Sequence, residues 1–258
     1  MCNDKRETTP LVSVIMPAYN AARFIEEAIS SVINQTVTDW ELLVIDDGSK
    51  DETRELVARL AETDCRIRLI VNEQNMGVAK TRNRGLDLCS GAYVAYLDSD
   101  DYWNAEFLKK MMARLDETHA DIVYCSYELV DEENQKVCND FMVPLETTFK
   151  NSIRRSVITC STVMVTSEIA KNHRFPTDMY HEDIALWFKL LRDGKVARGV
   201  TDVLAAYRQR ADSRSSGKIR SAFRRWKIYR RHLEMPFFQS VFTMIQYGYY
   251  GMKKFKRI

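Results

Sequence analysis

Short apolar runs alternate along the first hundred residues with segments in which apolar residues recur every three or four positions. The apolar runs predict β-strands at 12–16, 41–45, 67–71 and 92–97. The run 41–45 is almost wholly apolar, which is typical of a parallel strand covered on both faces. The periodic segments predict helices after Asn20, after Ser49 and over 78–89. Strands that alternate with helices predict an α/β fold built on a mainly parallel sheet.

Two of these helices are preceded by residues that commonly cap a helix N-terminus. Asn20 comes before the apolar positions of the first helix, and we expect it to be the N-cap. Ser49 and Glu52 match the S-x-x-E pattern of a capping box, so we expect them to start the second helix together.

The pattern loosens beyond residue 105, where helices and strands no longer alternate strictly. Further elements are predicted as helices near 105–117 and 182–192 and as strands near 122–127, 162–165 and 203–207. The chain has 258 residues, which fits one large domain or one domain with an appendage. The second half is therefore expected to be of mixed topology.

Composition and cysteine spacing bound the class of protein. With 45% hydrophobic and 29% charged residues, the chain can bury a sizeable core. The six cysteines form no C-x-x-C pair, so free thiols in a reducing cytosol are expected. Residues 1–10 are polar and lack the apolar core of a signal peptide. We therefore expect a cytoplasmic protein.

Charge divides the chain near residue 213. Residues 214–258 hold 12 lysines and arginines and a single acid, Glu234, whereas 1–213 hold 26 basic and 35 acidic residues. The net charge of the whole chain, +2, hides this asymmetry. We therefore expect a catalytic or binding body over 1–213 and a basic tail over 214–258 that meet different partners.

Polar signatures follow three of the predicted strands. They are Pro17-Ala18-Tyr19-Asn20, Asp46-Asp47-Gly48-Ser49 and Asp98-Ser99-Asp100-Asp101. Ligands of open α/β sheets bind beyond the carboxyl ends of the strands, where such loops converge. A ligand site is therefore expected there.

Asp98 and Asp100 are separated by one residue, so an extended backbone would point both carboxylates to the same side. They would repel each other unless a cation or hydrogen-bond donors compensate. Mg²⁺ or Mn²⁺ would suit, because these hard ions often combine one or two carboxylates with substrate phosphates. The alternative is a solvated turn in which an aspartate caps a helix.

The three signatures, with Asn75-x-Gly77, Arg82-Asn83 and His181-Glu182-Asp183, occur in an order and spacing that resemble the family 2 glycosyltransferases over about 11–210. The resemblance implies a GT-A fold, which is a Rossmann-like three-layer α/β sandwich. It also implies a nucleotide-diphosphate sugar donor, with UDP expected as the nucleotide, and a single displacement that inverts the anomeric centre.

The resemblance also implies roles for individual residues. Asp47 would bind the base, Asp98 would face the ribose and the metal, and Asp100 would ligate the cation. The expected nucleotide-sugar-binding residues are Pro17, Ala18, Tyr19, Asn20, Asp46, Asp47, Arg82, Asp98, Ser99 and Arg210. For Tyr19 the alternative is a cover over the core, and for Arg82 an ion pair on a helix surface.

On the acceptor side, Asp183 matches the catalytic carboxylate of the family, with His181 and Glu182 beside it. As a general base, Asp183 would take the proton of the attacking hydroxyl. Alternatively, it would only stabilise a helix N-terminus as a first-turn acid. Many relatives carry histidine where this chain has Arg210, so Arg210 is expected to bind the diphosphate rather than the metal.

The tail contains 18 uncharged residues from Met235 to Met252, of which 11 are apolar or aromatic, between two basic clusters. Phe238, Phe242, Ile245 and Tyr249 recur at helical spacing, which predicts an amphipathic helix too polar to span a membrane. We expect residues 218–258 to bind an anionic membrane surface at its inner face, and no nucleic acid. The alternative is a helix whose aromatic residues pack on the body or on a second subunit.

The predicted function is transfer of the sugar to a hydroxyl of a glycan or lipid-linked saccharide in cell-surface polysaccharide biosynthesis. Two alternatives stay open at this point. One is a polyprenyl-phosphate glycosyltransferase, which would need no strong hydroxyl base. The other is a scaffold that binds sugar nucleotides without catalysis.

Overall fold

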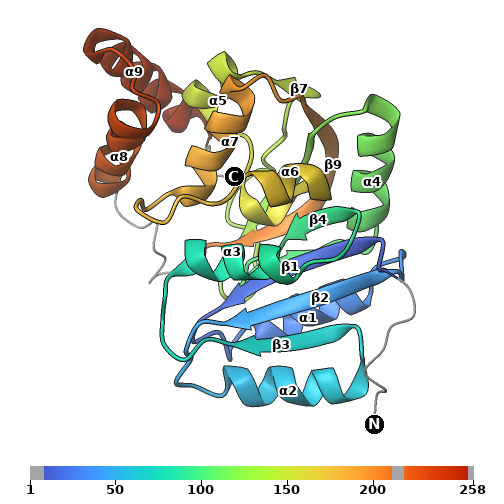
Figure 1. Cartoon of the computed structure of the whole chain (residues 1–258). Helices are drawn as coiled ribbons and strands as arrows, with labels where there is room; N and C mark the ends of the chain where they lie inside the picture. The colour runs from blue at the N-terminus through green and yellow to red at the C-terminus, as the bar shows by residue number, and fades with distance from the viewer. Residues whose placement is uncertain (1–8, 211–217, 255–258) are drawn as a thin grey trace.

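The computed structural model describes residues 9–210 and 218–254, and a mixed sheet runs through it (Figure 1). Within the described residues the sheet has nine strands, in the order β3-β2-β1-β4-β8-β6-β9-β5, with β7 paired to β9. The strands are β1 (Val12–Ala18), β2 (Trp40–Asp46), β3 (Ile67–Val71), β4 (Tyr93–Tyr96), β5 (Tyr102–Trp103), β6 (Ile122–Val130), β7 (Glu146–Thr147), β8 (Val163–Thr166) and β9 (Ala197–Arg208).

The N-terminal half of the sheet is parallel, as the sequence predicts. β2 and β4 both pair with β1 in parallel, and β3 extends the sheet beyond β2. Every residue of β1 and of β2 is buried, because helices cover both faces of these strands. Those helices are α1 (Ile25–Ile33), α2 (Thr53–Thr63) and α3 (Val78–Leu88), with α3 in front of the parallel strands and α1 behind them (Figure 1). The three-layer α/β fold is therefore confirmed.

The C-terminal half of the sheet mixes directions. β8 is antiparallel to β4 and to β6, and β6 then pairs in parallel with β9. The strand predicted at 203–207 is longer, because β9 runs from Ala197 to Arg208. The two-residue strands β5 and β7, both paired to β9, were not predicted. The helices of this half are α4 (Phe107–Thr118), α5 (Phe149–Arg155), α6 (Ser167–Asn172) and α7 (Glu182–Arg192).

Both helix caps predicted from the sequence are wrong. α1 begins at Ile25 and α2 at Thr53, and neither Asn20 nor Ser49 caps a helix. Instead, the Asn20 N–H donates to Ser49 Oγ at 2.9 Å, and Asn20 Oδ1 accepts from the Lys50 N–H at 2.9 Å. These two hydrogen bonds join the loop after β1 to the loop after β2, so they hold the ends of the two strands together.

The tail folds as α8 (Lys218–Lys227), a π-helical turn (Ile228–His232) and α9 (Phe237–Lys254). The predicted boundary at residue 213 lies outside the described residues. Beyond it, Tyr229 and Leu233 are buried in a second apolar cluster with Ile153 and Phe188 of the body. The Tyr229 hydroxyl also donates to the Ile153 carbonyl at 2.5 Å. The first half of the tail is therefore anchored to α5 and α7.

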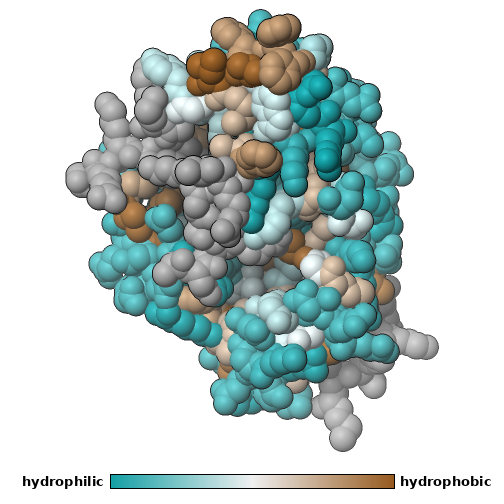
Figure 2. Space-filling view, turned by 90° about the vertical axis from the view of Figure 1, so that its left-hand side faces the viewer, coloured by the Kyte–Doolittle hydropathy of each residue, from teal (hydrophilic) through white to brown (hydrophobic). Residues whose placement is uncertain are grey.

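α9 turns its small polar side chains inward and its aromatic side chains outward. Ser240 and Thr243 are buried, whereas Phe238, Phe242 and Ile245 are exposed. Figure 2 shows hydrophobic residues gathered at the top of the molecule, where α9 lies in Figure 1. No helix in the described ranges is both long and apolar enough to span a membrane.

Candidate active site

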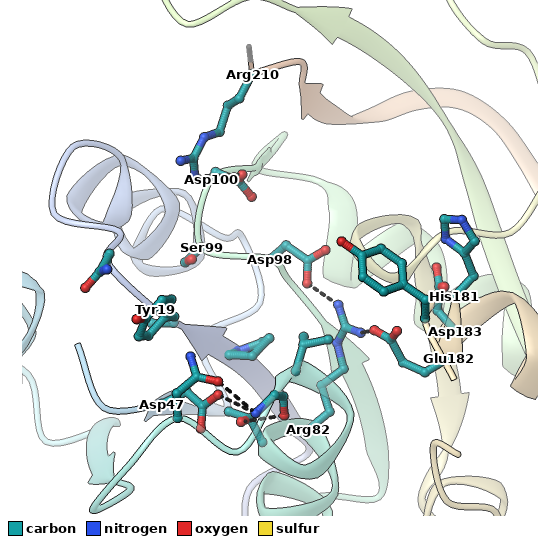
Figure 3. A pocket seen from close by; sticks show the side chains of 18 of the residues that line it. Tyr19, Asp47, Arg82, Asp98, Ser99, Asp100, His181, Glu182, Asp183 and Arg210 are labelled. Atoms are coloured by element: carbon teal, nitrogen blue, oxygen red, sulfur yellow. Dashed lines mark hydrogen bonds and ion pairs between the residues drawn. The ribbon is translucent and has the colours of Figure 1, made fainter. Parts of the chain in front are cut away.

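A pocket of about 710 Å³ opens at the carboxyl ends of the parallel strands (Figure 3). It is bounded by the loops after β1, β2 and β4, the start of α7 and the end of β9. The structure brings these predicted site residues to its lining: Pro17, Ala18, Tyr19, Asn20, Asp47, Arg82, Asp98, Ser99, Asp100, His181, Glu182, Asp183 and Arg210. Tyr19 and Asp47 lie on one side of the pocket, and His181 and Asp183 on the other (Figure 3).

Asp46 is placed differently from what the sequence suggests. Its side chain is fully buried and is absent from the lining of this pocket. The carboxylate accepts from Arg54 Nε at 2.6 Å and from the Ser49 N–H at 3.1 Å. Asp46 therefore stabilises the loop after β2, and the structure does not bring it to the pocket lining as predicted.

Asp47 organises the loop that precedes α3. One carboxylate oxygen accepts from Asn72 Nδ2 at 2.7 Å and from the Met76 N–H at 2.9 Å. The other accepts from the Gly77 N–H at 2.8 Å, and Gly77 has a φ of 87°, which favours glycine. Asn72 was not identified from the sequence, although Asn75-x-Gly77 was. These bonds fix the position of the Asp47 carboxylate at the edge of the pocket.

Arg82 links the two sides of the pocket through buried ion pairs. Its side chain, 4% exposed, donates from Nη2 to Asp98 Oδ1 at 2.5 Å and from Nη1 to Glu182 Oε1 at 2.7 Å (Figure 3). It is therefore not an ion-pair partner on a helix surface. Since Glu182 begins α7, this bridge fixes the position of that helix relative to the loop after β4.

The loop Asp98–Asp101 is held by residues that the sequence did not single out. Arg208 donates from Nε to the Asp100 carbonyl at 2.8 Å, and its backbone N–H donates to Asp101 Oδ1 at 2.8 Å. Ser161 donates to the other oxygen of Asp101 at 2.5 Å. Asp101 is consequently buried and supports the loop from beneath. The only sequence signal for these contacts was the run of four polar residues directly after a predicted strand.

The Asp100 carboxyl group has a raised pKa. Burial raises the pKa of its carboxyl group, and the nearby Asp98 charge raises it further. Arg210 Nη1 lies 3.4 Å from Asp100 Oδ2 and opposes this effect. A cation bound beside Asp100 would offset this effect of burial and of the Asp98 charge.

The donor set fits Mg²⁺ or Mn²⁺ bound together with a diphosphate. Asp98 and Asp100 supply hard oxygen atoms, and the described residues contain no cluster of three or more histidine, cysteine, aspartate or glutamate side chains that could enclose an ion. Asp98 and Asp100 would supply one or two ligands to such an ion, and substrate oxygens and water would supply the rest.

Asp183 lies in the first turn of α7 and lines the pocket opposite Tyr19 (Figure 3). Burial, with a further contribution from the Glu182 charge, raises the pKa of its carboxyl group to about 6. A carboxylate with this pKa is a stronger base than an ordinary aspartate and is still largely deprotonated near neutral pH. Asp183 can therefore accept a proton from a group bound beside it.

The fold and the site together define an α/β protein with a carboxylate-rich ligand pocket at the carboxyl ends of its strands. Residues 13–168 match the family described as Glycosyl transferase family 2. The chain therefore belongs to this family and is an inverting glycosyltransferase.

Relatives of similar length support the assignment. TuaG of Bacillus subtilis, named for teichuronic acid biosynthesis, is 34% identical over 95% of this chain and 97% of its own. WfgD of Escherichia coli, named as a UDP-Glc:α-D-GlcNAc-diphosphoundecaprenol β-1,3-glucosyltransferase, is 35% identical over 95% of this chain and 94% of its own.

Solved structures share the fold. TarS of S. aureus in complex with UDP-GlcNAc has a TM-score of 0.72 at 22% identity, over 94% of this chain and 72% of that one. A mannosyltransferase of Pyrobaculum calidifontis, in complex with GDP-Man and Mn²⁺, has a TM-score of 0.64 at 22% identity, over 97% of this chain and 66% of that one.

Proposed function

We propose that this glycosyltransferase moves a sugar from a UDP-sugar to a hydroxyl of a lipid-linked saccharide in cell-surface polysaccharide biosynthesis. The observation that carries the proposal is the position of Asp183. Its carboxylate, with a pKa of about 6, shares one pocket with the Asp98–Asp100 pair and with Asp47. The lipid-linked acceptor and UDP as the donor nucleotide are supported by the names of WfgD and of the TarS complex.

In this proposal the nucleoside lies between Tyr19 and Asp47, and the diphosphate lies toward Asp98, Asp100 and Arg210. A bound Mg²⁺ or Mn²⁺ would offset the charge that develops on the departing diphosphate. Asp98 and Asp100 would hold the ion, and Arg210 would donate to the phosphate oxygens. Asp183 takes the proton of the acceptor hydroxyl as that oxygen attacks the anomeric carbon from the face opposite the diphosphate.

The raised pKa of Asp183 favours a hydroxyl acceptor over a polyprenyl phosphate. A phosphate oxygen is already charged near neutral pH and needs no base, whereas a sugar hydroxyl must lose its proton during the attack. An Asp183→Asn variant is therefore expected to lose activity. A variant that retains most of its activity would favour the polyprenyl-phosphate alternative.

Nucleotide binding is tested by calorimetry with UDP, GDP, dTDP and CMP, each with and without Mn²⁺. We expect UDP to bind more tightly with Mn²⁺, and Asp100→Ala to lose that gain. Asp202→Ala is the matched control, because Asp202 is an exposed aspartate paired with Lys110, outside the pocket lining. If no nucleotide binds the unaltered protein, both the proposed transfer and the sugar-nucleotide-binding scaffold are refuted.

We also propose that α9 binds an anionic membrane surface. In the structure the side of α9 that carries Ser240 and Thr243 packs inward. Phe238, Phe242 and Ile245 are therefore exposed and can contact a membrane. Exposed Arg230 and Arg231 precede the helix, and basic side chains near an anionic surface each contribute about 1 kcal/mol. An aromatic face with basic flanks suits the boundary between head groups and acyl chains.

The membrane proposal is tested with the full chain and vesicles that contain phosphatidylglycerol. Phe238→Ser with Phe242→Ser is expected to weaken co-sedimentation, because both rings would enter the interface. Leu145→Ser is the matched control, since Leu145 on the body is 59% exposed and Phe242 is 58% exposed. Equal binding by the unaltered and the double-variant protein would refute the membrane role.

A further inference from the structure

One side chain of the tail, Arg224 of α8, stacks on a residue that lines the pocket near Asp183. The Arg224 guanidinium of α8 lies 3.2 Å from the centroid of the Tyr180 ring, and Tyr180 lines the pocket. The Tyr180 ring in turn contacts the His181 ring edge to face, with centroids 5.7 Å apart. The contacts from His181 through Tyr180 to Arg224 therefore connect the pocket lining, which also includes Asp183, to α8.

The side chains around Arg224 give this surface a positive charge. Neither α8 nor the π-helical turn contains an acidic residue, and α8 ends in arginine and lysine and the turn in two arginines and a histidine. Lys227 of α8 and Arg230 of the π-helical turn are exposed, and Phe223 is an exposed aromatic residue of α8. An anion at the mouth of the pocket would therefore meet favourable charge, and an attached hydrocarbon would meet an apolar ring.

The neighbouring Arg225 shows why Arg224 is the residue suited to a ligand. Arg225 is buried, donates from Nη2 to Ser156 Oγ at 2.6 Å, and stacks on Phe188 and Tyr247. It therefore holds α8 against the body and α9. Arg82, at the same end of the pocket, is buried between two carboxylates. Arg224 is only half-buried and stacks on Tyr180, which is a residue of the pocket wall.

We propose that Arg224, on its Tyr180 platform, binds the diphosphate that joins the acceptor saccharide to its lipid, an inference that rests on the function proposed above. An acceptor whose hydroxyl reaches Asp183 has its diphosphate on the far side of the acceptor sugar, toward the pocket mouth. A guanidinium binds such a group bidentately, and stacking on a tyrosine orients its donors. The lipid then continues past Phe223 toward the exposed aromatic residues of α9.

This arrangement gives the tail a role in acceptor choice besides membrane attachment. Saccharides without a charged linkage would leave Arg224 without its phosphate contact. They would consequently bind more weakly than the same saccharides on a lipid diphosphate. The membrane surface and the diphosphate are different anions, so vesicles of matched charge separate them.

The test uses the full chain and phosphatidylcholine vesicles doped with either undecaprenyl diphosphate or phosphatidylglycerol at equal negative charge. We expect the unaltered protein to prefer the diphosphate vesicles by about tenfold, the usual size of a charge-assisted contact. Arg224→Gln is expected to abolish the preference, and Arg224→Lys to retain part of it. Lys109→Gln is the matched control, because Lys109 is an exposed cation on α4 and is expected to leave the preference unchanged.

Equal binding of the unaltered protein to both vesicle types would overturn the inference, and this comparison needs no substituted protein. An Arg224→Gln variant that keeps the full preference would also overturn it. A merely structural role of Arg224 would lower the melting temperature without changing the vesicle preference. Binding of UDP with Mn²⁺ is measured on the same samples. Its failure in the unaltered protein would refute the proposed function, whereas its retention in Arg224→Gln shows that the donor site is intact.

Discussion

The buried ion pairs of Arg82 allow a quantitative test of the pocket architecture. Glu182 is 7% exposed and Asp98 is 31% exposed, while Arg82 itself is 4% exposed. Removing one partner of a buried pair costs about 3–5 kcal/mol, because the other charge is left uncompensated. Arg82→Gln would leave Glu182 in that state. Asp98 is partly solvated, so its contribution should be at most about 1 kcal/mol.

We therefore expect Arg82→Gln to lower the free energy of unfolding by about 3–4 kcal/mol near pH 8. The assay is urea unfolding followed by circular dichroism. A thermal scan should show a decrease of roughly 10 °C, since a chain of this size loses about 2–4 °C per kcal/mol. Arg174→Gln is the control, because its pair with Asp87 is exposed on both sides and should be worth less than about 1 kcal/mol.

A double substitution separates charge from packing. Glu182→Gln added to Arg82→Gln removes the stranded charge, so much of the lost stability should return. A loss below about 1 kcal/mol, or a double variant no more stable than Arg82→Gln, would refute the reasoning.

Two further predictions concern catalysis and packing. The value of kcat should rise as the pH passes about 6, because Asp183 must be deprotonated to take the proton of the acceptor hydroxyl. Asp183→Asn should lower kcat by roughly 10²–10⁴-fold and abolish this pH dependence. Gly85→Ala should cost about 1–3 kcal/mol in urea unfolding, since its Cβ would lie 2.5 Å from Ile15 Cγ2. Gly248→Ala, where nothing lies within 4 Å, is its control, and equal stability of the two variants would contradict this explanation.

The longer strands and their order of appearance were predictable because they are rich in apolar residues. β3 occupies the predicted 67–71, and α7 occupies the predicted 182–192. The two-residue strands β5 and β7 carry no such signal, because their pairing partner β9 is remote in sequence. Local patterns report which face of an element is buried, but not which distant segment covers it.

The helix caps failed for a related reason. Asn20 and Ser49 have the residue types of N-caps, yet each finds its hydrogen-bond partner in the other's loop. Those loops are about thirty residues apart along the chain, and only the parallel pairing of β1 with β2 brings them together. In the folded protein these residues therefore hydrogen-bond to a distant loop and not to the first turn of the helix that follows each of them.

By itself, the sequence determined the α/β class, the family and most of the pocket lining, because motifs at strand ends must converge at one edge of a parallel sheet. Only the tertiary structure decided which of two adjacent carboxylates faces the pocket and which is buried. Asp46 is buried against Arg54, whereas Asp47 lies in the pocket, although the two are adjacent in sequence. It also placed Arg82 between Asp98 and Glu182 and Arg224 on Tyr180. Burial and charge pairing depend on atoms remote in sequence, and these fix the pKa and the role of each group.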